Sequence, residues 1–178
     1  MENTNNAMPN LYFRPLYATE IEVRISQAGN WGVQLLLYQT SRAAMNILDE
    51  AVGKLNWKRA HQNIAGKLFC EISIYNPTTD EWVSKSDVGN PSLVDSNKGE
   101  SSDAFKRAAV NWGIGRELYN SPKIFISADH LSTLKNVNGK WKCNDFIKVA
   151  DIQYNNDSVI YLKLYNCTTR EHLEFFNN

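Results

Sequence analysis

The chain has 178 residues, and its content of 43% hydrophobic and 11% aromatic residues is typical of a folded globular protein and argues against a largely disordered one. The formal net charge is zero and the pI is about 6.8, so the charge of the whole molecule gives no support to nucleic-acid binding. Any basic surface must come from segregation of charge, and residues 54–67 carry four basic residues and no acidic one.

The cysteines and the hydropathy of the chain further limit the class of protein. Cys70, Cys143 and Cys167 are odd in number, far apart and form no C-x-x-C pair, which argues against a disulfide framework and against a zinc site. No apolar run has the length of a membrane span, and no secretory signal is recognised. The sequence therefore predicts an intracellular protein with reduced, buried thiols and no membrane association.

The first forty residues predict an arm, a helix and a strand. Residues 1–10 are rich in asparagine and lack periodicity, which is typical of a flexible arm. Apolar residues at spacings of three and four, followed by a glycine, predict a short helix over residues 18–28. The apolar run at residues 32–39 predicts a buried strand.

A second helix and a strand are predicted next. The hydroxyl of Thr40 or Ser41 can cap the N-terminus of this helix, and Gly53 can adopt the left-handed conformation that ends it. Between these signals, apolar residues recur at the spacing of one helical face, which predicts that this face packs in the core. Residues 57–64 are then predicted to form a strand.

The next two strands are predicted to pair as a hairpin. Residues 67–75 alternate between apolar and polar side chains, as a half-buried strand does. The sequence Asn-Pro-Thr-Thr-Asp at residues 76–80 is typical of a turn, so residues 81–88 can return as the antiparallel partner. Residues 89–99 are predicted to form a loop that leads to a long helix.

The long helix, predicted within residues 101–119, combines an apolar stripe with adjacent basic residues. The stripe has the spacing of one helical face and consists of Phe105, Ala108, Ala109 and Trp112. Arg107 points almost the opposite way, beside Lys106, so a second face can meet an anionic group. The alternative is a solvated face with an ion pair between Asp103 and Arg107, four residues apart. Two glycines just after the stripe predict a close backbone approach or an early helix end.

The C-terminal third predicts strands joined by tight turns. Asn138-Gly139 is a strong hairpin signal, and turn residues at 155–158 and 166–169 separate three further alternating runs. These signals predict a β-meander within a β-rich extension over residues 128–178. Since no repeat or linker is found, the sequence indicates one α+β domain over residues 11–178, with antiparallel sheet and two to three helices.

The motifs of common enzyme classes are not found in the sequence. Each Gly-Lys pair is followed by Leu or Trp and not by Ser or Thr, so the sequence lacks a phosphate-binding P-loop. The three histidines stand alone, without the spacing of a metal site. Five scattered carboxylates could supply the metal cluster of a nuclease: Asp80, Asp87, Asp95, Glu100 and Asp103. A metal-dependent nuclease therefore stays an alternative.

The long helix resembles the signature helix of the Rad52 family of single-strand annealing proteins, in its phage Sak and bacterial DdrA branches, through the run DAFKRAAVNWGIGRELY from Asp103 to Tyr119. The resemblance covers roughly residues 14–127, because the upstream segments follow the family's order. These segments are EIEVRISQAG, a strand, RAAMNILDEAVGKLNWK, a hairpin with EWVSKSDVG, and the Lys98-Gly99 pair. The C-terminal meander is not part of the resemblance.

The resemblance implies a β-β-β-α core that assembles into rings or related oligomers and holds single-stranded DNA in a basic groove, with no ATP, no catalytic metal and no other cofactor. Lys106 and Arg107 match the adjacent cations of the family that contact the DNA backbone. Arg24 matches an upstream arginine of the same groove, with a plain structural ion pair as the alternative. Lys85 and Lys98 lie in segments that could line the groove, without defined family positions.

The function expected from this resemblance is single-stranded DNA binding and ATP-independent annealing of complementary strands, in phage or prophage homologous recombination and double-strand break repair. Such a protein positions its ligand and is not an enzyme. The expected partners are single-stranded DNA, further copies of the chain and a host or phage single-strand-binding protein, in the cytoplasm of a bacterial host. Besides the nuclease, the second alternative is a non-DNA assembly or adaptor protein on the same fold, which the zero net charge favours.

Overall fold

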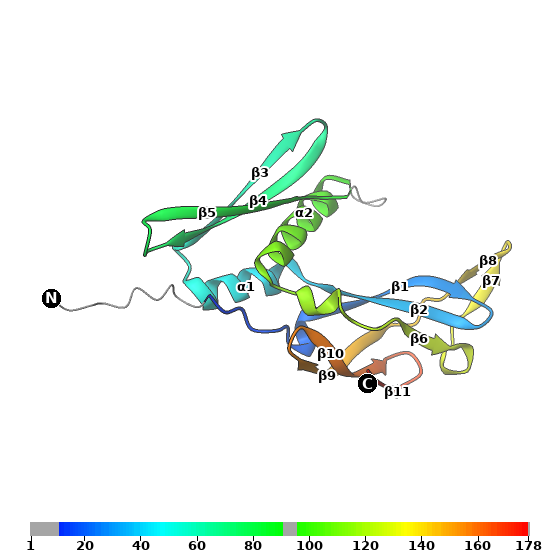
Figure 1. Cartoon of the computed structure of the whole chain (residues 1–178). Coiled ribbons are helices and arrows are strands. Elements are labelled where there is room, and N and C mark those ends of the chain that lie inside the picture. The colour runs from blue at the N-terminus through cyan, green and yellow to red at the C-terminus, as the bar shows by residue number, and fades with distance from the viewer. Residues whose placement is uncertain (1–10, 91–95, 178) are drawn as a thin grey trace. The chain divides into compact units, whose positions relative to one another are not determined.

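The computed structural model describes residues 11–90 and 96–177, whose helices and strands are drawn in Figure 1. The chain forms two compact units, each built from segments that are separated in sequence. The first unit comprises residues 1–14 and 41–115, and the second comprises residues 15–40 and 116–178. The arm predicted over the first ten residues lies outside the described residues, and the domain boundaries stay predictions.

The first unit is an antiparallel sheet with a helix across one face. Its elements in chain order are α1 (Ser41–Val52), β3 (Trp57–Ile64), β4 (Lys67–Asn76), β5 (Glu81–Val88) and α2 (Ser96–Trp112). The three strands pair in the order β3-β4-β5, and α2 packs against β4 and β5 (Figure 1). This order is the expected β-β-β-α core, and the elements predicted from residue 41 to residue 88 are confirmed.

The core of the first unit lies between β4 and α2. Side chains alternate along β4, so that Cys70, Ile72 and Ile74 are buried on the face toward the helix. The predicted stripe of α2 is confirmed, because Phe105, Ala108 and Ala109 are fully buried and Trp112 is half-buried. Packing of these two apolar surfaces fixes which face of α2 remains accessible.

The three cysteines differ in burial. Cys70 is fully buried, and this burial raises the pKa of its thiol to about 11, so the group is neutral at physiological pH. Cys143 and Cys167 are free thiols that are only half-buried, which departs from the expectation that all three are buried. Cys143 directly follows β8, and Cys167 lies in the turn after β10.

The second unit consists mainly of strands. Its elements are the 3-10 helix Ala18–Glu20, β1 (Ile21–Gly29), β2 (Gly32–Gln39), the 3-10 helix Arg116–Leu118, β6 (Ile124–Ser127), the 3-10 helix Ala128–His130, β7 (Lys135–Val137), β8 (Lys140–Lys142), β9 (Ile147–Asn155), β10 (Ser158–Asn166) and β11 (Glu171–Phe176). The strand orders of its sheets are β1-β2-β6, β11-β10-β9 and β7-β8. The C-terminal meander and the α+β fold class are therefore confirmed.

The first strand of the second unit corrects a sequence prediction. The helix predicted over residues 18–28 is wrong, because only its first residues form a 3-10 turn and Ile21–Gly29 forms β1. Ile21, Val23 and Ile25 alternate with polar residues along this strand. Pairing with β2 fixes this segment as a strand, with its apolar side chains on the less exposed face, and that tertiary contact outweighs the helical spacing.

The long helix also has different ends from those predicted. Helix α2 begins at Ser96, inside the segment 89–99 that is predicted as a loop, and ends at Trp112. Gly113 has a φ of 108°, a conformation that side chains disfavour, so the two glycines mark the early end of the helix. Among the described residues, no helix has the length and hydropathy needed to cross a membrane.

Candidate nucleic-acid interface

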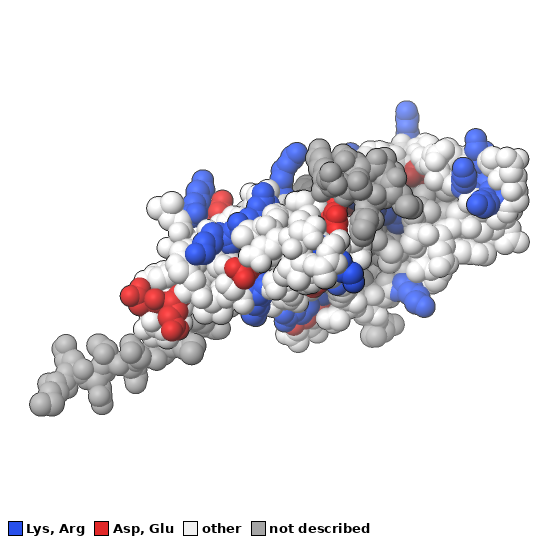
Figure 2. Space-filling model, turned by 90° about the horizontal axis from the view of Figure 1, so that it is seen from above, with Lys and Arg blue, Asp and Glu red and all other residues white. Residues whose placement is uncertain are grey.

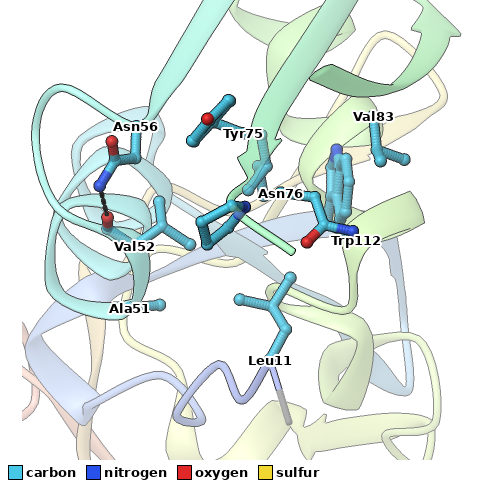
Figure 3. A pocket seen from close by; sticks show the side chains of 10 residues that line it. Leu11, Ala51, Val52, Asn56, Tyr75, Asn76, Val83 and Trp112 are labelled. Atoms are coloured by element: carbon cyan, nitrogen blue, oxygen red, sulfur yellow. Dashed lines mark hydrogen bonds between the residues drawn. The ribbon is translucent and has the colours of Figure 1, made fainter. Parts of the chain in front are cut away.

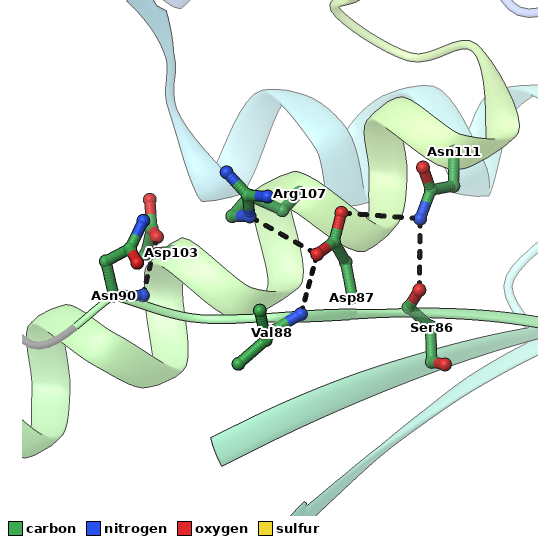
Figure 4. A network of polar contacts seen from close by, with 7 residues as sticks. All are labelled: Ser86, Asp87, Val88, Asn90, Asp103, Arg107 and Asn111. Carbon is green, nitrogen blue, oxygen red and sulfur yellow. Dashed lines mark hydrogen bonds and ion pairs between the residues drawn. The ribbon is translucent and has the colours of Figure 1, made fainter. Parts of the chain in front are cut away.

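One edge of α2 meets β5 along a line of polar contacts, which we call the α2–β5 seam: Lys85, Ser86, Asp87, Arg107 and Asn111. Figure 4 shows all of these residues except Lys85. Arg107 Nε donates to Asp87 Oδ1 at 3.3 Å, and the two side chains are 36% and 25% exposed. Asn111 Nδ2 donates to the carbonyl oxygen of Ser86 at 3.0 Å and lies 3.5 Å from Asp87 Oδ2. The seam therefore ties the helix to the edge strand through a half-exposed ion pair.

Lys85 lies at the end of the α2–β5 seam that is next to the C-terminus of α2. Its Nζ donates to the carbonyl oxygen of Asn111 at 3.0 Å and lies 4.5 Å from the centre of the Trp112 ring. A cation at this end of a helix compensates the partial negative charge of the last carbonyls. Trp112 is held in turn by a hydrogen bond from Nε1 to the carbonyl oxygen of Ile72, at 3.1 Å.

The partner of Arg107 differs from the alternative that local spacing suggests. The ion pair of Arg107 runs to Asp87 on β5, while Asp103 Oδ2 accepts a hydrogen bond from the backbone of Asn90 at 2.9 Å (Figure 4). The pair thus links two elements and does not lie within the helix. Lys106, next in sequence, is half-buried on the same helix.

The remaining predicted site residues lie in different places. Lys98 belongs to α2, but its side chain lies outside the described residues. Arg24 lies on β1 of the second unit, where its side chain is 61% exposed. It is 3.4 Å from Glu22 and lies over the ring of Tyr38, with 5.1 Å between the guanidinium carbon and the ring centre. The structure thus brings Lys85 and Arg107 together and places Arg24 in the other unit.

Two cations of β3 extend the basic character of the first unit, and the sequence prediction of site residues does not include them. Lys58 Nζ lies 4.2 Å from the centre of the Trp82 ring, and the guanidinium carbon of Arg59 lies 4.8 Å from the centre of the Phe105 ring. The signal that could identify them is the acid-free run at residues 54–67. Figure 2 shows basic side chains spread over the part of the surface that the β3-β4-β5 sheet forms, with acidic ones between them and a group of acidic ones at one end.

The carboxylates considered for a nuclease make separate contacts. Asp80 accepts a hydrogen bond from the hydroxyl of Tyr75 at 2.6 Å, and Glu100 accepts one from the backbone of Leu68 at 3.3 Å. Asp87 and Asp103 have the partners described above, and Asp95 lies outside the described residues. Within residues 11–90 and 96–177, no three metal-binding side chains form a group. The geometry of these residues gives the nuclease alternative no support.

A pocket of about 390 Å³ lies in the first unit, between the end of α1, the end of β4, β5 and the end of α2 (Figure 3). Its walls are mainly apolar and include Leu11, Val52, Ile74 and Trp112. The polar side chain of Asn56 is engaged, since Nδ2 donates to the carbonyl oxygen of Val52 at 2.8 Å. No charged side chain is among the residues that line it, so the pocket does not suit a phosphate group.

An antiparallel sheet covered on one face by a helix whose exposed edge carries cations is typical of a scaffold that binds an anionic polymer through fixed positive charges. The chain belongs to the Rad52/22 family of double-strand break repair proteins, whose family model matches residues 7–136. Membership implies DNA binding and DNA strand annealing in recombination and repair, by proteins that are generally not catalytic. Comparison with curated proteins finds no match to the chain. Strands β9 to β11 lie beyond the matched residues.

Proposed function

We propose that this protein binds single-stranded DNA and anneals complementary strands without ATP, in phage or prophage recombination within a bacterial cytoplasm. The observation that carries the proposal is that Lys85 and Arg107 are both held by contacts on the α2–β5 seam, within the segment that the family model matches. Cations held by protein contacts are already positioned when a phosphate arrives, so binding orders few side chains.

Annealing by such a surface requires no covalent step. The protein must hold the phosphates of one strand, reduce the repulsion between two strands and leave the base edges exposed to test a complement. The ion pair engages Arg107 through Nε, and a guanidinium has further N–H donors with which it can bind a phosphate oxygen. Asp87 then acts as the resting partner of Arg107 in the DNA-free protein.

Oligomerisation would reconcile DNA binding with the zero net charge. A ring or related assembly repeats a small basic surface along one continuous track, so that many weak contacts act on one strand. A host or phage single-strand-binding protein would deliver the strand. The size of the assembly in solution can be measured by light scattering on the full chain, and a monomer that still anneals strands would contradict the ring.

Removing the candidate DNA cations is expected to reduce the salt dependence of binding. Each phosphate contact with a single strand contributes up to about 0.7 to the slope of log affinity against log salt. Lys106→Gln with Arg107→Gln should therefore reduce this slope by up to about 1.4, and adding Arg24→Gln should reduce it by up to about 2. Fluorescence anisotropy with a labelled oligonucleotide measures the slope. Lys123→Gln with Arg170→Gln, two exposed cations of the second unit, is the charge-matched control and should leave it unchanged. A wild-type slope in the first variant would remove Lys106 and Arg107 from the interface.

Replacing Asp87 with asparagine is expected to strengthen DNA binding. The change removes the charge that neutralises Arg107, so Arg107 no longer exchanges a carboxylate for a phosphate, and the salt slope should steepen by up to about 0.7. The control is Asp80→Asn, which removes a carboxylate of the same unit that bonds to Tyr75 and not to a cation. Equal behaviour of the two variants would show that Arg107 serves the fold alone.

Strand annealing and nuclease activity are separated in one assay. Labelled complementary strands are incubated with the protein in EDTA, in magnesium and in manganese, and the products are resolved by length. The proposal expects duplex of full length under all three conditions, and a slower rate for the Lys106 and Arg107 variant. Shortened strands in the presence of metal would overturn it in favour of the nuclease.

A further inference from the structure

The β7–β8 hairpin carries three lysines on one face. Asn138 and Gly139 form its turn, with φ values of 52° and 79°, and the register pairs Lys135 with Lys142 and Val137 with Lys140. Because side chains alternate along a strand, Lys135, Lys140 and Lys142 share one face, and Asn136 and Trp141 occupy the other. We call the face that carries Lys135, Lys140 and Lys142 the lysine face.

The lysine face is unfavourable to the fold of the hairpin. Lys135 and Lys142 are directly opposite, and like charges in this arrangement destabilise a pair of strands. Each strand has only three residues, and an isolated hairpin of this kind has little stability to spare. No acidic residue occurs within the hairpin itself, between Leu134 and Lys142. Figure 2 shows basic side chains gathered at the tip formed by β7 and β8, without an acidic one visible among them in that view.

We propose that the lysine face of the β7–β8 hairpin is a second DNA contact, which binds the phosphodiester backbone without contacting the bases. This inference rests on the proposed function, since a family of DNA-annealing proteins makes DNA the anion that the lysines meet. A phosphate backbone supplies anions in a row and would relieve the repulsion between Lys135 and Lys142. Strand β8, which carries Lys140 and Lys142, lies beyond the residues that the family model matches, whereas Lys135 lies at the end of the matched range.

The chemistry of the lysine face selects the backbone and not the bases. Trp141, the aromatic residue of the hairpin, points to the opposite face and is 37% exposed, so it is not placed to stack on a base held by the lysines. Lysine is a point charge that accepts phosphates of any sequence, single-stranded or duplex. The hairpin belongs to the second unit and the α2–β5 seam to the first, so each unit would contribute a surface to DNA binding.

The test compares the full chain with the variant in which Lys135, Lys140 and Lys142 are all replaced by glutamine. Anisotropy titrations at several salt concentrations use a labelled single strand and, separately, a labelled duplex of the same length. We expect the slope of log affinity against log salt to fall by about 2 for the single strand and by about 2.7 for the duplex, if each lysine contacts one phosphate. The control replaces three exposed cations elsewhere in the second unit, Lys123, Lys148 and Arg170, by glutamine, and keeps the wild-type slopes.

Each outcome decides between specific alternatives. Equal losses in the lysine-face variant and in the control would show a general effect of net charge and would overturn the inference, as would unchanged slopes in the lysine-face variant. A loss confined to one DNA form identifies that form as the ligand. If the Lys106 and Arg107 variant loses binding while the lysine-face variant binds normally, the proposed function stands and this inference fails. A melting temperature at or above that of the wild type verifies folding, since the substitutions relieve the repulsion between Lys135 and Lys142.

Discussion

Replacing Phe105 with alanine is expected to lower the free energy of unfolding by about 3–5 kcal/mol. Phe105 has no exposed surface and is the largest of the fully buried side chains among the described residues. Its ring stacks near Trp57, with 6.3 Å between centres, and supports the guanidinium of Arg59. Truncation would leave a cavity between α2 and β4, the two elements that form the core of the first unit.

Urea denaturation followed by circular dichroism measures this loss. Phe125→Ala is the matched control, because Phe125 is 50% exposed and contacts Trp31 edge-on, an interaction of about 1 kcal/mol. Similar losses for both variants would show that the core does not depend on Phe105. Since Lys106 and Arg107 follow directly on the same helix, Phe105→Ala should also weaken DNA binding, whereas Phe105→Leu should keep most of both properties.

Local sequence patterns are sufficient to predict most helices and strands of this fold, because the signals for these elements come from neighbouring residues. The alternation of apolar and polar residues at 67–75 predicts a strand with one buried face. Asn138 and Gly139 readily adopt the positive φ angles of the turn that joins β7 and β8. The failure at β1 has a specific cause. Ile21 and Ile25 are four residues apart, a spacing that places side chains on one face in a helix and also in a strand. Pairing with β2 decides between them, and that contact is not local.

The candidate site is less accessible to sequence reasoning because the partner of a charge depends on tertiary packing. Local spacing proposes Asp103 as the partner of Arg107, whereas the structure uses Asp87, which lies 20 residues away on β5. The contact of Lys85 with the end of α2 has the same origin, since the strand and the helix end meet only in the folded unit. Conversely, the stripe that orients the helix is local, so the exposure of its basic edge is predictable.

Replacing Asp145 with alanine is expected to lower the free energy of unfolding by about 3 kcal/mol or more, because buried donors left without an acceptor cost about 1–3 kcal/mol each. Asp145 is 7% exposed and accepts hydrogen bonds from the backbone of Ser132 at 3.1 Å, the backbone of Thr133 at 2.9 Å and Nδ2 of Asn166 at 2.8 Å. Asp129→Ala, at an exposed aspartate of the same unit, is the control and should change stability little.

The position of this network connects the stability of the second unit to the proposed DNA contact. Ser132 and Thr133 precede β7 and Asp145 follows β8, so their hydrogen bonds hold the two ends of the hairpin together. We therefore expect Asp145→Ala to weaken duplex binding as much as removal of the three lysines does, at a temperature where the rest of the unit remains folded. Wild-type duplex affinity in a variant whose hairpin is disordered by NMR would contradict the role of the lysine face.

The charge of Asp145 also gives the stability of the protein a defined dependence on pH. Burial acts to raise the pKa of Asp145, but the hydrogen bonds from Asn166, Thr133 and Ser132 outweigh it and hold the pKa below its ordinary value. A carboxyl whose pKa is lower in the folded than in the unfolded chain contributes stability above the unfolded value, about 3.9, and loses it as the pH falls through the folded value. The difference in unfolding free energy between the wild type and Asp145→Asn should therefore be constant near neutral pH and narrow below about pH 4. A gap that stays constant or widens on acidification would show that the carboxylate is not stabilised by these donors.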